Sequence, residues 1–175
     1  MKRSQVEHVL RAAAAITQEL SFVVVGSQAI LLAFPDAPQE LLVSRELDLY
    51  PALNPAKADL IDGAIGAMSS FDETFGYHAD GVGPETAVMP PDWETRSQLF
   101  YVGEVTAICP EVHDLAVSKC VAAREKDADF IRILLRHQMI GIDLLLERIS
   151  KVDAGKHPVQ SIAEWARRRA AEARA

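Results

Sequence analysis

The stretch that decides the fold covers residues 23–51 and reads VVVGSQAILLAFPDAPQELLVSRELDLYP. A β-branched apolar run stops at Gly26-Ser27, a second apolar segment follows, and then Glu46 and Asp48 alternate with two leucines. Because side chains alternate across a strand, both carboxylates point to one face and both leucines to the other. Two carboxylates on one face repel each other, so the pattern indicates a bound cation, and carboxylate oxygens suit Mg²⁺. A half-exposed strand with its acids in water gives the same alternation.

The Gly26-Ser27 pair complements the two carboxylates. A small residue at the end of a strand lets a phosphate approach the backbone, and the N-terminus of the following helix offers N–H groups and a partial positive charge. A carboxylate pair can also hold two metal ions that clamp the attacking and leaving oxygens of a phosphoryl transfer. The purely structural alternative is a turn followed by a serine that caps a helix.

Composition places the chain among ordinary globular proteins. Its 175 residues suit one domain, and 49% of them are hydrophobic and 25% charged. The formal net charge of −7 argues against a general nucleic-acid coat protein, which needs a basic face.

The two cysteines, Cys109 and Cys120, lie in apolar segments and form no C-x-x-C pair. We therefore expect buried thiols in a reducing cytoplasm, with no disulfide framework and no cysteine metal site. The N-terminus has no apolar signal-peptide region, and no apolar run reaches the roughly 18 to 20 residues of a membrane span. The five histidines show no metal-ligand spacing. These features predict a cytoplasmic protein without a membrane partner.

Hydrophobic periodicity predicts an α+β fold, with a small sheet in the first part of the chain and a helical C-terminal half. We expect residues 1–110 to form the sheet and its helices, and residues 111–175 to form helices packed on the same domain. The expected strands cover 22–25, about 41–50, a short piece near 86–89 and the segment 98–109. The expected helices cover 4–20, the residues after Ser27, about 55–68, the segment 113–127 after Pro110, about 126–149 and 158–174.

Four motifs in order resemble those of a known family. They are GSQAI at 26–30, SRELDLYP at 44–51, DLAVSK at 114–119 and REKDADF at 124–130, with GVGPETAVMPPDWETR at 81–96 between them. A strand ending in Gly-Ser, a helix and a strand carrying acid-x-Asp look like the DNA polymerase β-type nucleotidyltransferases, whose sheet is small and mixed. Over residues 20–135 the chain more closely resembles the short single-domain branch of the AbiEii/MenT toxin superfamily.

The resemblance implies roles for the first two motifs. Gly26 and Ser27 would bind the nucleoside triphosphate, and Asp48, together with Glu46, would hold Mg²⁺, with Asp48 also catalytic. The chain departs from the family at Glu46, where the superfamily usually has Asp, and tight octahedral Mg²⁺ geometry is sensitive to the extra methylene. No third strand carboxylate can be placed, because VTAICP at 105–110 has no acid.

The resemblance also implies roles for the last two motifs. Lys119 would meet the phosphates, and Asp127 would stand at the catalytic acid position with the nucleotide-binding Arg124 and Lys126 beside it. If 112–129 is one helix, the two lysines share a face and the arginine pairs with the aspartate. Such cations suit a triphosphate, although a solvated helix with ion pairs has the same pattern.

The function implied is Mg²⁺-dependent transfer of a nucleoside monophosphate from a nucleoside triphosphate to an acceptor hydroxyl, with release of pyrophosphate. The resemblance suggests a tRNA 3′ end or a protein as acceptor, and a toxin that pairs with an antitoxin or acts in phage defence. Two alternatives stay open. One is a non-catalytic scaffold of the same fold that binds nucleotide or a partner protein, and the other is a small-molecule nucleotidyltransferase of the aminoglycoside-modifying kind.

Overall fold

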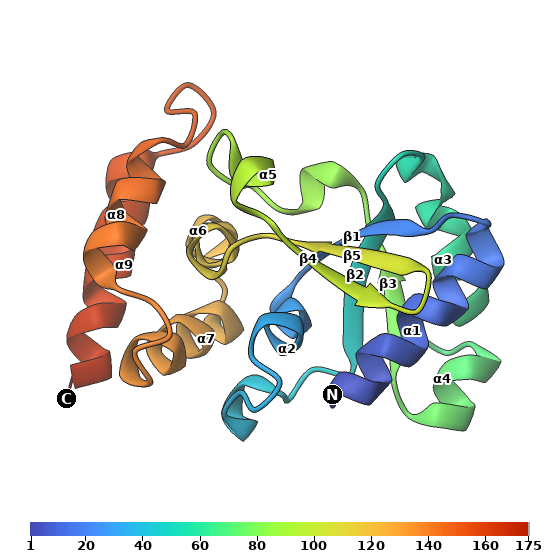
Figure 1. Ribbon diagram of the computed structural model, residues 1–175. Coiled ribbons are helices and arrows are strands. Elements are labelled where there is room, and N and C mark those ends of the chain that lie inside the picture. The colour runs from blue at the N-terminus through green and yellow to red at the C-terminus, as the bar shows by residue number, and fades with distance from the viewer. Residues whose placement is uncertain (175) are drawn as a thin grey trace. The chain divides into compact units, whose positions relative to one another are not determined.

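The computed structural model describes residues 1–174, shown in Figure 1. The chain divides into two compact units. Unit 1 comprises Met1–Thr86 and Ser97–Cys109, and unit 2 comprises Ala87–Arg96 and the residues from Pro110 onward. The junction after Cys109 lies next to the predicted division at residue 110, whereas the segment 87–96 groups with the helical unit.

Unit 1 contains all five strands of the described chain, and the α+β class is confirmed. Its strands are β1 (Ser21–Val25), β2 (Glu46–Pro51), β3 (His78–Gly81), β4 (Gln98–Val102) and β5 (Val105–Cys109). Its α-helices are α1 (Arg3–Thr17), α2 (Ile30–Ala33), α3 (Ala58–Ile65) and α4 (Ser70–Phe75). Its 3₁₀ turns are η1 (Ser27–Ala29), η2 (Gln39–Leu41), η3 (Pro55–Lys57) and η4 (Pro84–Thr86).

The described part of unit 2 consists of helices and the loops that join them. It contains α5 (Trp93–Arg96), α6 (Val112–Ala122), α7 (Glu125–Arg136), α8 (Ile142–Ser150) and α9 (Val159–Arg174). Helix α9 packs along both α7 and α8, and α6 packs against α7 and α8. The buried apolar side chains of these helices form a core of their own, for example at Leu115, Ile131, Leu134, Leu145 and Ile149.

The strands form one mixed sheet in the order β3-β2-β1-β5-β4. Strand β1 pairs antiparallel with β2 and parallel with β5, β2 pairs parallel with β3, and β4 forms an antiparallel hairpin with β5. Strand β1 is central and almost wholly buried, as its β-branched sequence predicts.

Helices α1 and α3 cover one face of the sheet, as Figure 1 shows. Leu47 and Leu49 point to this face and are fully buried, as predicted. The approach of α3 is so close that a Cβ on Gly81 would lie 2.1 Å from the carbonyl oxygen of Ala58. The opposite face therefore carries the side chains that alternate with these leucines.

Several predicted elements are corrected by the structure. The short strand expected near 86–89 is wrong, and the third strand is β3 at residues 78–81. The helix expected at 126–149 is interrupted, because α7 ends at Arg136 and α8 begins only at Ile142. The single helix considered for 112–129 is also wrong, because Ala123 adopts a left-handed conformation with φ of 50° that ends α6.

Both cysteines are buried, as expected. Burial raises the pKa of the Cys109 thiol, and it raises the pKa of Cys120 to about 12, so both groups stay protonated and unreactive at neutral pH. No helix within residues 1–174 combines the length and the apolar character needed to cross a membrane.

Candidate functional site

Gly26 follows β1 directly and adopts a conformation that only glycine tolerates, with φ of 71° and ψ of −177°. A Cβ at this position would lie 1.6 Å from Oδ2 of Asp48. The carboxylate of Asp48 therefore lies against the Gly26 backbone, which the pairing of Val25 with Asp48 across β1 and β2 makes possible. The turn and the acid that the sequence singled out separately are in contact.

Ser27 begins a short helical segment. The turn η1 has three residues and α2 has four, so the predicted helix after Ser27 is present but brief. A segment this short carries little macrodipole, so a phosphate at this turn would depend on the local N–H groups and the serine hydroxyl. Ser27 Oγ accepts a hydrogen bond of 3.4 Å from Gln28 Nε2, which leaves its own O–H to act as a donor.

Gln28 was not singled out by the sequence, yet it is fully buried beside this turn. Its Nε2 also donates to the carbonyl oxygen of Leu41 at 3.0 Å, and so ties the turn to the segment that leads into β2. Its Oε1 is buried without a hydrogen-bond partner in the described chain. Through these two hydrogen bonds, Gln28 connects the Gly26-Ser27 turn to the segment before β2.

Glu46 and Asp48 lie on one face of β2, as predicted. Both are half-buried, and the leucines that alternate with them are buried on the other face. The parallel register between β2 and β3 places Asp80 beside Asp48 and His78 beside Glu46. Asp80 is therefore a further strand carboxylate next to Asp48, and the sequence pattern did not reveal it.

The environment of Asp80 disfavours the ionised form of its carboxyl group. Burial raises its pKa above the ordinary value of 3.8, and the negative charges of Asp62 and Glu46 raise it further. The signal in the sequence was HADG at 78–81, in which His78 and Asp80 alternate with two small residues as the acids of β2 alternate with leucines. A cation on this face would relieve the repulsion.

The donor set on this face is chemically suited to Mg²⁺. Glu46, Asp48 and Asp80 offer only carboxylate oxygens, the hard ligands that this ion prefers. Within residues 1–174, however, no three His, Cys, Asp or Glu side chains are grouped closely enough to hold a metal ion alone. Mg²⁺ in nucleotide enzymes is commonly held by one or two carboxylates and the substrate phosphates, which fits a strand pair such as Glu46 and Asp48.

In unit 2, Lys119 and Asp127 lie close together. The side chain of Lys119 on α6 is only 10% exposed, and its Nζ lies 3.9 Å from Oδ1 of Asp127. The ammonium group also lies 5.9 Å from the centre of the Phe130 ring. The contacts with Asp127 and Phe130 fix the position of this buried lysine.

Asp127 is bound to Arg124, and the predicted pairing of the two is confirmed. Nε and Nη2 of Arg124 donate to the two carboxylate oxygens at 2.7 and 3.2 Å, and the backbone N–H of Arg124 donates to Oδ2 at 3.2 Å. The Asp127 side chain is 3% exposed and caps the start of α7. Lys126 is exposed. Because it lies on α7 and Lys119 lies on α6, the two lysines do not share a helix.

A buried ion pair in the DLAVSK segment was not predicted. Asp114 on α6 is fully buried, and its two carboxylate oxygens accept hydrogen bonds of 2.7 and 3.1 Å from Arg96 on α5. Arg148 on α8 lies 3.8 Å from the same carboxylate. Asp114 therefore joins the segment 87–96 to the helix that carries Lys119.

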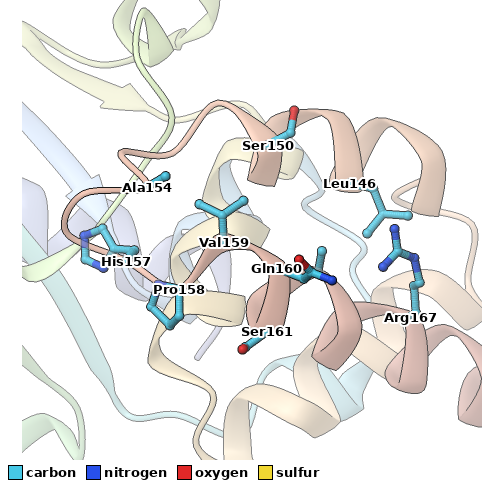
Figure 2. Close-up of a pocket in the computed structure, with 10 residues that line it drawn as sticks. Leu146, Ser150, Ala154, His157, Pro158, Val159, Gln160, Ser161 and Arg167 are labelled. Carbon is cyan, nitrogen blue, oxygen red and sulfur yellow. The ribbon is translucent and has the colours of Figure 1, made fainter.

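Unit 2 also contains a cavity of about 590 Å³ between α8 and α9 and the turn that joins them, shown in Figure 2. It includes none of the residues that the sequence singled out for catalysis or nucleotide binding. Its lining residues are Leu146, Ser150, Ala154, His157, Pro158, Val159, Gln160, Ser161, Ala163 and Arg167.

The predicted residues thus form two groups. Gly26, Ser27, Glu46 and Asp48 gather at the end of β1 and on one face of β2 in unit 1. Lys119, Arg124, Lys126 and Asp127 gather where α6 gives way to α7 in unit 2.

A family model described as "Nucleotidyltransferase of unknown function (DUF6036)" matches residues 4–169, almost the whole chain. Comparisons with curated proteins and with solved structures gave no match.

Proposed function

The chain belongs to this nucleotidyltransferase family, and from that premise we propose that it moves a nucleoside monophosphate from a nucleoside triphosphate to an acceptor hydroxyl, with Mg²⁺. The observation that carries the proposal is the Asp48 carboxylate lying against the Gly26 backbone. Glu46 and Asp80 flank it on the same face of the sheet. Such an arrangement would bring a triphosphate and a divalent cation to one place.

In unit 1, the backbone at Gly26 and the hydroxyl of Ser27 would bind the triphosphate. Glu46 and Asp48 would hold Mg²⁺, one ion or two, and Asp80 adds negative charge beside them. Bound there, the ion would neutralise charge that develops on the phosphate and the leaving group. Asp48 would also help to take the proton of the acceptor hydroxyl.

In unit 2, Lys119 is proposed to meet the phosphates, with Arg124 and Lys126 as further cations. Asp127 stands where the resemblance puts a catalytic acid. Its burial and its bonds to Arg124 favour a supporting role, in which it fixes the positions of Arg124 and Lys119. Phosphoryl transfer depends mainly on charge and positioning, which these residues would supply.

The source of the transferred group tests the reaction class. The protein is incubated with Mg²⁺ and each nucleoside triphosphate, labelled at the α-phosphate or at the γ-phosphate, together with bacterial RNA, protein and aminoglycosides. We expect an acceptor to gain label from the α-phosphate only. Label from the γ-phosphate alone would mean a kinase and would overturn the proposal.

For the acceptor we propose tRNA or a protein, and for the cellular role a toxin with an antitoxin partner. The distribution of charge makes unit 2 less repulsive to RNA than unit 1. Unit 1 has 5 basic and 13 acidic residues, whereas unit 2 has 13 basic and 12 acidic residues. Binding of tRNA that weakens steeply with added salt would support tRNA as the acceptor. Salt-independent transfer to a protein would exclude tRNA and leave the protein acceptor.

A second candidate is a scaffold that binds nucleotide without transfer. It is favoured by Glu46, whose longer side chain replaces the usual Asp, and by the lack of a three-ligand metal group within residues 1–174. Calorimetry separates the two candidates. Mg²⁺-dependent binding of a nucleoside triphosphate, with no labelled product from any acceptor, would establish the scaffold.

A further inference from the structure

Strand β4 is an edge of the sheet without the usual protection. Among residues 1–174 the sheet gives it β5 as its one neighbouring strand, and its sequence QLFYV contains no charge and no proline. The side chains of Leu99 and Tyr101 are 53% and 70% exposed. The other edge, β3, is shorter and carries His78 and Asp80. Because natural edge strands are normally blocked by charge, proline or bulges, β4 has the character of a strand that is paired in its working state.

The backbone of β4 is open on its outer side. The N–H of Thr106 donates to the carbonyl oxygen of Leu20 at 2.7 Å, so this residue of β5 bonds toward β1. Tyr101 lies opposite Thr106, and Leu99 lies opposite Ile108. Since alternate residues bond across an antiparallel pair, Tyr101 and Leu99 direct their N–H and C=O groups away from β5. No backbone partner meets those groups within residues 1–174.

This edge is complementary to itself in one register. If a second β4 lies antiparallel with the twofold axis at Phe100, Leu99 of each copy faces Tyr101 of the other. The outward N–H and C=O groups of these residues then bond in pairs, and the exposed apolar side chains cover one another. On the other face the two Phe100 side chains lie opposite each other, each with the Arg3 guanidinium of its own copy 5.6 Å from the ring centre, and aromatic pairs across strands are stabilising.

We propose that the chain forms a twofold-symmetric dimer in which β4 pairs antiparallel with β4 of a second copy. The two sheets become one continuous sheet, and both open edges are removed. Opposed residues in an antiparallel pair share a face, so the axis is perpendicular to the sheet. The faces that carry Glu46 and Asp48 in the two copies then look to the same side.

Sedimentation of the full chain tests the proposal. Because an interface of one strand pair is small, the measurement covers concentrations from about 1 to 300 µM. We expect a concentration-dependent monomer–dimer equilibrium. A chain that stays monomeric over this range would overturn the proposal.

Two double variants test the register with equal disturbance of the strand. Leu99→Lys with Tyr101→Glu places a lysine opposite a glutamate in the proposed register, and this variant should still dimerise. Leu99→Lys with Tyr101→Lys places lysines opposite lysines, and this variant should be monomeric. Circular dichroism checks that both are folded. Val43→Lys changes an apolar residue that is 81% exposed away from β4, and it should leave the dimer unchanged.

A cross-link gives an independent reading of the same register. Residues on the twofold axis form a close, non-bonded pair, with Cα atoms about 4.5 Å apart, within reach of a disulfide. Phe100→Cys should therefore form a disulfide-linked dimer on mild oxidation, while the buried Cys109 and Cys120 stay reduced. If the two double variants dimerise equally, or if Phe100→Cys stays unlinked, the β4 pairing is wrong.

Discussion

At the scale of the residue, two independent constraints exclude a side chain at position 26. The φ of 71° with ψ near 180° is open to glycine alone, and the space where a Cβ would lie is taken by Asp48. The sequence showed Gly26 and Asp48 as separate candidates 22 positions apart. Their contact depends on the register of β1 and β2, which a sequence pattern does not specify.

Gly26→Ala should displace the Asp48 carboxylate. The strained backbone costs about 1 to 3 kcal/mol of stability, and a misplaced acid should lower nucleotide transfer by about a hundredfold. Gly76→Ala is the matched control, because Gly76 has a φ of 74° but no atom within 4 Å of the place that a Cβ would occupy, so only stability should suffer. Equal transfer rates in the two variants would show that the contact with Asp48 is irrelevant.

Asp80→Asn should stabilise the metal-free protein at neutral pH. Burial and neighbouring acids raise the pKa of Asp80, so its ionised form destabilises the folded state, and this penalty disappears as pH falls through the folded pKa. The melting temperature of the variant should exceed that of the wild type at pH 7 and approach it near pH 3. Added Mg²⁺ should stabilise the wild type more than the variant.

Glu104→Gln, in the exposed β4–β5 turn, is the control for removing one negative charge. It should leave both the pH dependence and the response to Mg²⁺ unchanged. A variant at Asp80 that melts below the wild type at pH 7 would contradict the electrostatic interpretation.

At the scale of the element, strands whose own sequence specifies them were predicted. Elements that depend on contacts with other parts of the chain were not. Strands β1 and β2 follow from a β-branched run and from acid–leucine alternation. Strand β3 was missed because HADG has turn-like composition, and it becomes a strand by pairing with β2 and packing against α3. Its carboxylate was missed with it.

The break between α7 and α8 has the same origin. The apolar periodicity continues past Arg136, but Gln138 adopts a φ of 55° and Gly141 is the N-cap residue of the next helix. The N–H of Gly141 donates to Nε2 of His113 at 3.0 Å, so a contact with α6 fixes the start of α8. A partner 28 positions away leaves no local signal in the sequence.

Asp114→Ala should strongly destabilise unit 2. The change leaves Arg96, and in part Arg148, without the buried carboxylate that neutralises them, and breaking such a pair costs about 3 to 5 kcal/mol. Denaturant unfolding measures the loss. Asp143→Ala, at an exposed position of α8, should change stability by no more than about 0.5 kcal/mol. Similar unfolding midpoints for the two variants would mean that the Arg96–Asp114 pair contributes little.

At the scale of the whole molecule, the net charge of −7 conceals an uneven distribution. The excess of acidic residues belongs to unit 1, which carries the carboxylate face, that is, the face of β2 and β3 with Glu46, Asp48 and Asp80. In unit 2 the numbers of basic and acidic residues are nearly equal. The overall charge correctly placed the chain outside the strongly basic proteins, but it could not show where a polyanion would bind. The α+β class was predictable from hydrophobic periodicity. The nucleotidyltransferase family was predictable because four short motifs in a fixed order are together more specific than any one of them.

The measurement that tests the proposed transfer most directly compares the wild type with Asp48→Asn under identical conditions. The quantity is the rate at which α-phosphate label reaches the acceptor, with and without Mg²⁺. We expect the wild type to require Mg²⁺ and the variant, which keeps the shape but loses the charge, to be slower by more than about a hundredfold. A variant as fast as the wild type, in a protein that melts at the same temperature, would show that the carboxylate face of unit 1 is not the catalytic site.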